Sequence, residues 1–410
     1  MKPSPQILNE LFQLAEHESF EKVVEEYLSA IGKHPECLEL YHGLALYCAK
    51  SSQLDMATVI LESALQLNPE HAGSWFHMGR LLYEKMDFPG SVDCYLKSIE
   101  LEPSARNIFH LSLSQLSAGQ LEEGAKNYVH RFGDDELQEF RSLARWDPVV
   151  GQPATQKVLI WAEQGLGDEI MFSRFFVFLR ELPGAFTVEC DRRLLELYTE
   201  NFPWLSFVPR DQERQLAGFD AQLPVGDLFT LWPDRVNTPS LMSPLLRPVA
   251  RPELDWPRQP GKQYIGLSWL SMNEDFGARR SVAMQELLCA FDPGRHALVN
   301  LQYLAPPQDL ELARQAGFEL IDAADCFADI EGLAWLISRC DSVVSIDNTA
   351  LHLAGAMGVP TYGLVPHLPN WRWQVSGRGC AWYPRVQLLF QLQQGRWDAE
   401  LQQLRQCLNA

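Results

Sequence analysis

The spacing of apolar residues changes between the first third of the chain and the rest of it. Before residue 147, segments of apolar and small residues repeat at a fixed interval and have the length of helices. From residue 157 onward, short apolar runs alternate with segments of helical pattern. The runs are KVLIWA, FTVEC, LSFVPR, FDAQLPV, YIGLSWL, ALVNLQ, FELID, SVVSID and TYGLVP. Such alternation predicts parallel sheets with helices on both faces.

A repeat of 34 residues organises the first part of the chain. Pro35, Pro69 and Pro103 lie at this interval, and the similar segments EEYLSAIGKHP, LESALQLNP and YLKSIELEP lead up to them. The pattern resembles the tetratricopeptide repeat, in which small residues let two helices approach closely. The matching positions of two successive units are Tyr41, Leu44, Ala45, Ala57, Leu61, Ala64 and Pro69, and then Trp75, Met78, Gly79, Ser91, Tyr95, Ser98 and Pro103.

The outer units of this array match the repeat less well. Residues 4–37 fit poorly in their first helix, and the fourth unit is one residue short. Atypical end units are expected because a stacked array must cover its ends. The functional interpretation is a concave surface for a peptide or partner protein. The alternative is a spacer or a dimerisation element, and so a homo-oligomer.

Two proline-bearing stretches divide the rest of the chain. One is RWDPVVGQPATQ, and the other is residues 233–261, which carry seven prolines. We therefore predict the fold class α + α/β. The array covers residues 1–146, a first α/β lobe covers 147–245, and a second lobe with a C-terminal helix covers 246–410. Two sheets joined by a connector place a ligand cleft between them.

Composition limits the classes of function. Hydrophobic residues make up 46% of the 410 and charged residues 21%, as in folded soluble proteins. The net charge of −19 argues against nucleic acid or an anionic membrane as the main partner. The nine cysteines form no Cys-x-x-Cys pair, which favours reduced thiols over disulfides or a zinc site. No segment approaches about eighteen uninterrupted apolar residues, so we expect a cytoplasmic protein without a membrane span.

The turn after the first predicted strand, within VLIWAEQGLGDEIMF, carries an acid. Gly165 and Gly167 give the backbone room, but the third glycine of a dinucleotide fingerprint and the Gly-Lys-Ser/Thr of a P-loop are both missing. A carboxylate would also repel a phosphate. Asp168 either caps a helix that runs from Glu169 through Phe178 or acts in catalysis, and these residues alone leave both interpretations open.

A second strand–turn–helix unit, VVSIDNTALHLAGAMGVPTYGLVP, carries the densest group of polar residues. Asp347, Asn348 and Thr349 lie at the expected start of the helix, and His352 lies one turn further on. Free backbone N–H groups beside hydroxyl and amide side chains suit a pyrophosphate, and His352 could donate to its oxygens. The alternative is that Asp347 or Asn348 only caps the helix and His352 is a core histidine.

The motifs occur in an order that resembles bacterial glycosyltransferase family 9, the heptosyltransferase-like enzymes, and in particular the subgroup that carries tetratricopeptide repeats. They are GLGDE, GLSW, RRS, NLQ, SIDNTALHLAGAMGVPT and PNWRW, with RWDP before the first strand and AWYPRVQLLFQ near the end. The resemblance covers nearly the whole chain. It implies a GT-B architecture of two Rossmann-like lobes, with the acceptor chiefly on the first lobe and the nucleotide-sugar on the second, and normally no metal.

The resemblance also implies roles for single residues. Gly165 and Gly167 belong to the acceptor-side loop, and Asp168 is the candidate general base. If Asp168 is not the base, Glu163 and Glu169 are the next candidates.

On the donor side, Asp347 and His352 match the motif of the family. Asn348 and Thr349 depart from it, because the family more often has Thr and then Gly or Ala at these two positions. Arg279 or Arg280 is the natural candidate to assist the leaving diphosphate. The further donor-side candidates are Trp269 and Gln302, and the candidates for stacking are Trp269, Trp371 and Trp373.

The expected function is transfer of a sugar from a nucleotide-sugar to an acceptor hydroxyl, with inversion at the sugar. By analogy with bacterial flagellin-modifying and O-linked N-acetylglucosamine transferase-like enzymes, the repeats would present a protein acceptor such as flagellin. One alternative is transfer to a lipopolysaccharide-type glycan. Another is a tetratricopeptide scaffold whose second half only binds a nucleotide or a partner. No cofactor or metal is expected.

Overall fold

The computed structural model of the protein describes residues 5–133, 137–148, 156–210, 216–237, 244–273, 277–326, 328–373 and 380–409. The chain divides into two compact units, Met1–Gly133 and Asp134–Ala410. Parts of both proline-bearing stretches, residues 149–155 and 238–243, lie outside the described residues. No helix in the described part of the chain is long and apolar enough to cross a membrane.

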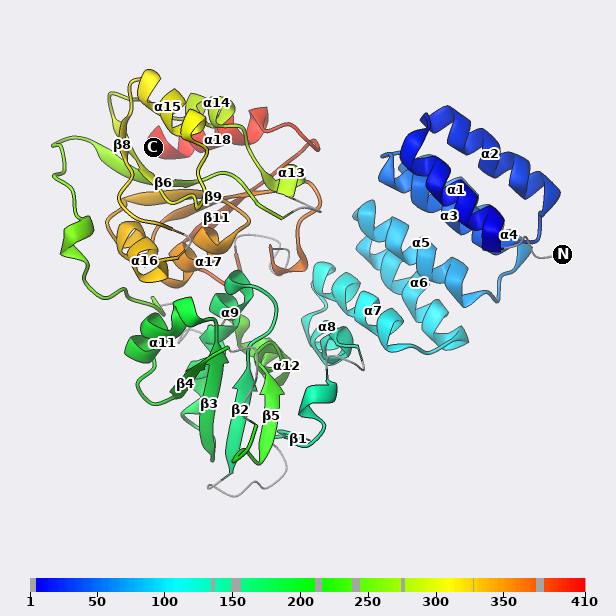
Figure 1. Ribbon diagram of the computed structural model, residues 1–410, viewed down its shortest axis with the longest axis horizontal. Coiled ribbons are helices and arrows are strands. Elements are labelled where there is room, and N and C mark those ends of the chain that lie inside the picture. Colours follow the sequence, from blue (N-terminus) through cyan, green and yellow to red (C-terminus); the bar gives the residue numbers. More distant parts are fainter. Residues whose placement is uncertain are drawn as a thin grey trace. The chain divides into compact units, whose positions relative to one another are not determined.

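The described part of the first unit is built from helices arranged in pairs (Figure 1). They are α1 (Pro5–His17), α2 (Phe20–Lys33), α3 (Leu38–Lys50), α4 (Leu54–Leu67), α5 (Ala72–Glu84), α6 (Phe88–Leu101), α7 (Ala105–Ser117) and α8 (Leu121–Tyr128), followed by the short η1 (Val129–Arg131). Polar caps start several of them: Asp87 accepts the N–H of Gly90, and Ser104 accepts that of Asn107. The four pairs match the predicted repeats, and the eight residues of α8 make the last pair short.

Small residues at the repeat positions are buried where the two helices of a pair pack against each other. Ala57 and Ala64 of α4 are fully buried, and the equivalent positions of α6 are Ser91 and Ser98, which are also fully buried. The Ser91 hydroxyl donates to the Gly79 carbonyl at 2.7 Å and the Ser98 hydroxyl to the Ala72 carbonyl at 2.9 Å. A serine therefore replaces alanine without leaving a buried hydroxyl unsatisfied.

The first sheet of the second unit is parallel and has the strand order β1-β5-β2-β3-β4 among the described residues. Its strands are β1 (Ala144–Arg145), β2 (Lys157–Trp161), β3 (Ala185–Cys190), β4 (Ser206–Pro209) and β5 (Ala221–Pro224). The helical segments of this lobe are η2 (Gln138–Phe140), α9 (Leu166–Phe172), η3 (Ser173–Phe175), α10 (Phe176–Leu179), η4 (Arg192–Leu194), α11 (Leu195–Asn201), α12 (Asp227–Leu231) and η5 (Pro233–Asn237).

The second sheet is also parallel, with the order β11-β10-β9-β6-β7-β8. Its strands are β6 (Gln263–Ser268), β7 (His296–Asn300), β8 (Glu319–Ile321), β9 (Ser342–Ile346), β10 (Thr361–Val365) and β11 (Val386–Phe390). The helical segments are η7 (Pro252–Leu254), α13 (Gly277–Arg280), α14 (Met284–Leu287), η8 (Leu288–Ala290), α15 (Pro307–Gln315), α16 (Ile330–Ser338), α17 (Thr349–Ala356), η9 (Trp371–Trp373) and α18 (Asp398–Asn409).

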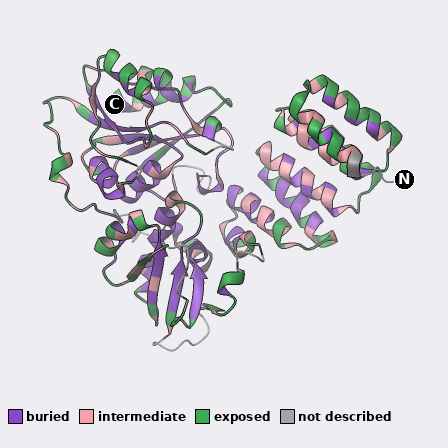
Figure 2. Cartoon of the chain, viewed as in Figure 1, coloured by how far each residue is buried: buried purple, intermediate pink, exposed green. Residues whose placement is uncertain are grey.

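Alternate residues of the second sheet face two different layers of helices. Leu364 of β10 belongs to a core that also contains side chains of α14, α15 and α18. The neighbouring Gly363 faces the other way, because a Cβ there would lie 3.1 Å from the side chain of Leu351 in α17. Figure 2 shows the strands of both sheets as largely buried. All nine predicted strands are present, and the predicted fold class is confirmed; β1 and β11 are additional strands.

Aromatic side chains from the end of the chain complete the core of the first lobe. Trp371 stacks on Phe229 with ring centroids 5.7 Å apart, and Trp382 contacts Phe175 edge-on at 6.4 Å. The segment after β10 therefore packs against helices of the first sheet.

Each sheet has one place where the direction of the strand order reverses. In the first sheet the chain runs from β2 through β3 to β4 and then returns to β5 on the other side of β2. In the second it runs from β6 to β8 and then returns to β9 on the other side of β6. In open parallel sheets, ligands bind outside the carboxyl ends of the strands at such switch points. The two polar motifs of the sequence follow β2 and β9, so both lie at switch points.

Candidate active site at the switch points of the two sheets

The first junction runs from β2 into α9 and carries Asp168. The helix begins at Leu166 with Gly165 as its N-cap residue, so Asp168 is the third helical residue. The interpretation of Asp168 as the helix cap is therefore wrong: the helix starts earlier than predicted, and no side chain caps it. The helical path continues through η3 and α10 to Leu179.

Asp168 is held by an arginine from the second lobe. The Arg372 guanidinium of η9 forms an ion pair with Asp168 Oδ1, with side chains 10% and 20% exposed respectively. The same Arg372 nitrogen donates to Gln164 Oε1 at 2.7 Å. Gln164 has a φ of 58°, which is unusual for a residue with a side chain. The positive φ of Gln164, just before α9, thus accompanies a hydrogen bond from Arg372 to the Gln164 side-chain oxygen.

Two other acids of this loop support the backbone. Glu163 Oε1 accepts the Gly226 N–H at 2.7 Å, and Glu169 Oε2 accepts the Asp191 N–H at 2.9 Å. Both are buried, and burial raises the pKa of Glu169 to about 8. These contacts give Glu163 and Glu169 a place between loops at the carboxyl ends of neighbouring strands, which fits a structural role better than that of a base.

The second junction runs from β9 into α17 and is capped by Asn348. Its side-chain Oδ1 accepts the Ala350 N–H at 3.0 Å, and its Nδ2 donates to Ser268 Oγ at 2.7 Å. Ser268 ends β6, so Asn348 joins the two strands that flank the switch point. The capping interpretation is right for Asn348.

Asp347 lies beside one of the two candidate arginines. Its carboxylate is 3.6 Å from the Arg280 guanidinium, whereas Arg279 is exposed. Burial raises the pKa of Asp347, and the charge of Arg280 opposes that shift. The geometry favours Arg280 over Arg279 as the cation of this site.

His352 connects the two junctions. Its Nδ1 is 3.0 Å from the Tyr383 hydroxyl, and burial lowers its pKa to about 3, so the imidazole is neutral at neutral pH. A Cβ on Gly167 would lie 2.7 Å from His352 Cδ2. Gly167 therefore lets α9 and α17 pack closely, rather than keeping an approach open for a ligand; the two helices are neighbours in Figure 1. At Gly165 a Cβ would meet no atom within 4 Å.

A cavity of about 160 Å³ lies at the start of α17 and draws on both lobes. Thr349 and Asn348 line it from the second lobe, and Leu166 and Arg193 line it from the first. The Arg193 side chain is 27% exposed and pairs with Asp191 at 2.9 Å. Nothing in the segment DRRLLEL distinguishes Arg193 as a site residue in the sequence.

Trp269 and Gln302 lie behind this cavity in the core. Trp269 is 1% exposed, and its indole N–H donates to Asp309 Oδ2 at 2.8 Å. Gln302 Oε1 accepts the backbone N–H groups of Trp269 and Leu270, each at 2.9 Å. Both residues therefore fix the loop after β6 from inside, which differs from the expected contact with the nucleotide-sugar.

The two tryptophans of the PNWRW motif are also buried. Trp371 belongs to the aromatic core of the first lobe. Trp373 packs on the His352 ring, with centroids 4.9 Å apart. They bracket Arg372, the residue of this motif that reaches the first junction.

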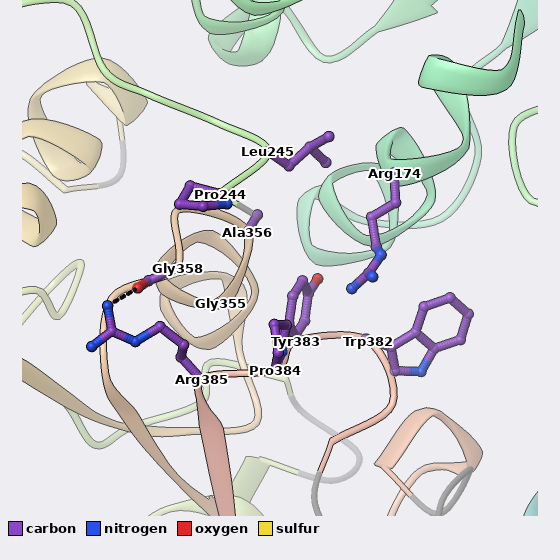
Figure 3. A pocket seen from close by; sticks show the side chains of 10 residues that line it. All are labelled: Arg174, Pro244, Leu245, Gly355, Ala356, Gly358, Trp382, Tyr383, Pro384 and Arg385. Atoms are coloured by element: carbon purple, nitrogen blue, oxygen red, sulfur yellow. Dashed lines mark hydrogen bonds between the residues drawn. The ribbon is translucent and has the colours of Figure 1, made fainter. Parts of the chain in front are cut away.

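A smaller cavity of about 30 Å³ lies at the other end of α17. Figure 3 shows Arg174 and Tyr383 facing one another there, and the guanidinium carbon is 5.5 Å from the centroid of the tyrosine ring. The Tyr383 hydroxyl in turn contacts His352. Tyr383 therefore contacts both His352 and Arg174.

No group of three or more His, Cys, Asp or Glu side chains within the described ranges is arranged to hold a metal ion. The nine cysteines are free thiols.

Comparison with known proteins gives similarity over most of the chain. No protein-family model matches it. The chain is 25% identical to Protein FlbA of Caulobacter vibrioides over an alignment 435 positions long, which covers 89% of this chain and 71% of that protein. Among solved structures, the glycosyl transferase family 9 structure from Veillonella parvula matches at 12% identity and a TM-score of 0.43, covering 62% of this chain and 92% of that one.

A tetratricopeptide-repeat protein of Thermus thermophilus, TTC0263, matches at 19% identity and a TM-score of 0.28, covering 33% of this chain and 79% of that one. The fold assignment itself rests on the helix pairs and strand orders described above.

Proposed function

We propose that the protein is a glycosyltransferase that moves a sugar from a nucleotide-sugar to an acceptor hydroxyl. The observation that carries this proposal is the meeting of the two switch points. Asp168 at the first is linked through Arg372 to the region of the α17 start at the second, next to a cavity of about 160 Å³. An acid paired with an arginine and close to a helix start is an arrangement that suits deprotonation of one group and departure of an anionic one.

The donor would bind with its diphosphate at the start of α17. The first N–H groups of a helix and its positive end favour an anion. Thr349 and Arg193 line the cavity there, and Arg280 lies 3.6 Å from Asp347, two residues before Thr349. If the Tyr383 O–H donates to His352 Nδ1, the neutral imidazole carries its hydrogen on Nε2 and can donate it to a phosphate oxygen.

Asp168 would act as the general base of a single displacement. The acceptor oxygen bonds to the anomeric carbon while the bond from that carbon to the phosphate oxygen breaks. The hydroxyl proton passes to Asp168, and the nucleoside diphosphate leaves with the electron pair. Attack from the side opposite the leaving group inverts the configuration of the sugar. Cationic side chains and the α17 start stabilise the charge that develops on the diphosphate.

The repeats would recruit a protein acceptor, for which flagellin is the candidate that the resemblance implies. Histidine and arginine side chains of α3 and α5, His42, His77 and Arg80, line a cavity of about 20 Å³ in this array. Arg106 of α7 lies over the Phe76 ring at 4.8 Å. These contacts support a surface that holds a polypeptide. Transfer to a glycan that enters the cleft directly is the alternative.

Hydrolysis of a nucleotide-sugar without acceptor tests the enzymatic proposal. The full chain is incubated with UDP-, GDP-, ADP- and CDP-sugars, and release of the nucleoside diphosphate is followed over time. We expect slow release from one donor class, because water can take the place of the acceptor. A chain that binds the diphosphate but releases none in either the presence or the absence of candidate acceptors is a scaffold.

Removal of the repeats tests the acceptor proposal. A chain begun at residue 134 keeps the second compact unit, and its folding is checked first by a cooperative melt. Transfer to a protein acceptor should fall sharply, because the array raises the local concentration of the acceptor. Donor hydrolysis should persist. A folded fragment that modifies the protein acceptor as fast as the full chain would show that the repeats serve another role, such as oligomerisation.

A further inference from the structure

Arg372 contacts the proposed base, and its charge acts on Asp347 and His352 at the second junction. Its guanidinium pairs with Asp168 and Gln164 on the first lobe and with Asn370 Oδ1 at 2.6 Å in its own segment. Its charge is also one of the causes that lower the pKa of His352, after burial. Arg372 is therefore within electrostatic reach of both junctions.

The ion pair occupies one of the two oxygens of the proposed base. A carboxylate can take the acceptor proton only with an oxygen that is free to approach the hydroxyl. In this structure, Asp168 is engaged by a guanidinium whose side chain is 10% exposed. Oδ1, the oxygen in the ion pair, must therefore be released before it can take the proton.

A bound diphosphate offers Arg372 a stronger partner than Asp168. Two phosphate groups carry more negative charge than one carboxylate, and guanidinium binds phosphate oxygens with two parallel hydrogen bonds. The neighbouring Trp373 already packs on His352, so the backbone of η9 lies against the side chains of the second junction. A rotation of the Arg372 side chain would move its charge from one junction toward the other.

We infer that Arg372 is a positioning residue that exchanges Asp168 for the diphosphate of the donor, so that the base is released only when the donor is bound. This inference rests on the proposed function. It predicts an ordered reaction in which the donor binds first and makes the enzyme competent to accept the hydroxyl. Donor binding would thus be coupled to activation of the base through one side chain.

A double-mutant cycle on diphosphate affinity tests the exchange without relying on activity. The variants are Asp168→Asn, Arg372→Met and their combination, with Arg396→Met as a control for net charge, since Arg396 is exposed and pairs with Asp398. The probe is whichever of UDP, GDP, ADP or CDP raises the melting temperature of the full chain most. Dissociation constants are measured by isothermal titration calorimetry at fixed salt.

The sign of the coupling decides the outcome. If Arg372 leaves Asp168 for the diphosphate, Arg372→Met should weaken binding about 10-fold in the wild-type background and about 100-fold in the Asp168→Asn background, where no ion pair has to be broken. Asp168→Asn alone should tighten binding. If Arg372 only screens the charge of Asp168, Arg372→Met should weaken binding in the wild-type background and have no effect once Asp168 is replaced. That result, or no effect in either background, overturns the inference.

Further measurements distinguish a failure of this inference from a failure of the proposed function. If Arg372→Met does not melt cooperatively, Arg372→Lys replaces it in the cycle. Lysine keeps the charge and loses the paired hydrogen bonds. The loss of diphosphate affinity should therefore again be larger in the Asp168→Asn background, but the difference between the two backgrounds should be smaller. If a diphosphate binds with the same dissociation constant whether or not Arg372 is replaced, this inference is wrong and the proposed function is unaffected. If none of the four diphosphates binds, the proposed function fails and the exchange fails with it.

Discussion

The two junctions share one local plan and use it in different ways. Each consists of a buried parallel strand, a polar turn and a helix at the switch point of its sheet. At the second, the Asn348 side chain caps the helix and ties β6 to β9, so this polar group is used by the fold. At the first, Gly165 supplies no capping side chain, and Asp168 on the first turn is left to pair across the lobes. Because Asp168 does not cap its own helix, its carboxylate can pair with Arg372 of the second lobe.

The same comparison explains the two glycines of the first junction. Gly165 has open space around it, whereas Gly167 faces the His352 ring of the other junction. The junctions are therefore complementary surfaces, with the small residue on one helix and the ring on the other. The predictions below test this pairing, from the largest expected effect to the smallest.

Replacement of Asp168 by asparagine should have the largest effect. Asparagine keeps an oxygen that can accept from Arg372 but removes the base, so transfer should fall about a hundredfold or more. Because the variant also neutralises one partner of a largely buried ion pair, a modest fall in melting temperature is expected. Asp398→Asn, at an exposed carboxylate, is the control. Transfer at the wild-type rate in Asp168→Asn would place the base elsewhere.

Alanine at the two glycines should separate their roles. At Gly167 the new methyl group meets His352 at 2.7 Å, so α9 and α17 must move apart or the ring must rotate, at a cost of about 1–3 kcal/mol. At Gly165, the N-cap residue, the cost should be about 0.5–1 kcal/mol, because alanine is a poorer N-cap residue than glycine. Chemical unfolding of both variants measures the difference. Equal stability would mean that the two helices do not touch as closely as described.

Asn348 and Thr349 are adjacent and should give opposite results. Asn348→Ala removes a cap and the link to Ser268, so the free energy of unfolding should fall by about 1–2 kcal/mol. Thr349→Val keeps the shape but removes a hydroxyl at the cavity, so stability should change little while affinity for the nucleoside diphosphate weakens several-fold. Melting curves and calorimetry on both variants make the test. Unchanged affinity in Thr349→Val would argue against a diphosphate at the α17 start.

Mild acid should lower the free energy of unfolding slightly through His352 of the second junction. In the unfolded chain a histidine takes up a proton near pH 6.5, whereas His352 in the folded protein does so only near pH 3, because burial lowers its pKa. Acid therefore favours the unfolded state, and the stability contributed by the neutral ring is present above about pH 6.5 and is lost as the pH falls toward 3. Between pH 7 and pH 6 the loss should be about 0.7 kcal/mol.

His352→Gln separates this effect from that of other titrating groups, because the repeats contain partly buried histidines whose pKa is also lowered by desolvation, His42 to about 3 and His110 to about 4. The difference in stability between wild type and His352→Gln should shrink as the pH falls from 7 to 6. A difference that does not depend on pH would show that His352 is not buried as a neutral ring.

Much of the fold follows from local patterns in the sequence. The 34-residue interval predicts the paired helices, because each pair needs small residues at the same positions to pack. The apolar runs predict the strands, since parallel strands are buried on both faces and read as continuous apolar segments. The polar turns after KVLIWA and SVVSID mark the site, because the ends of strands are where a parallel sheet exposes its loops. Such signals involve neighbours in the chain, so they can be read without the fold.

The contacts that complete the candidate site join residues far apart in the sequence. Arg372 reaches Asp168, Gly167 faces His352, and Arg193 lines a cavity beside α17. Trp269 and Gln302 belong to motifs of the site, yet their side chains turn into the core. No local rule predicts these positions, because the direction of a side chain at a strand end depends on which loop packs against it. The sequence alone determined the two sheets and the acid and helix start at their ends. Only the packing of one lobe on the other decided which arginine meets the acid and which residues of each motif line the cavity beside α17.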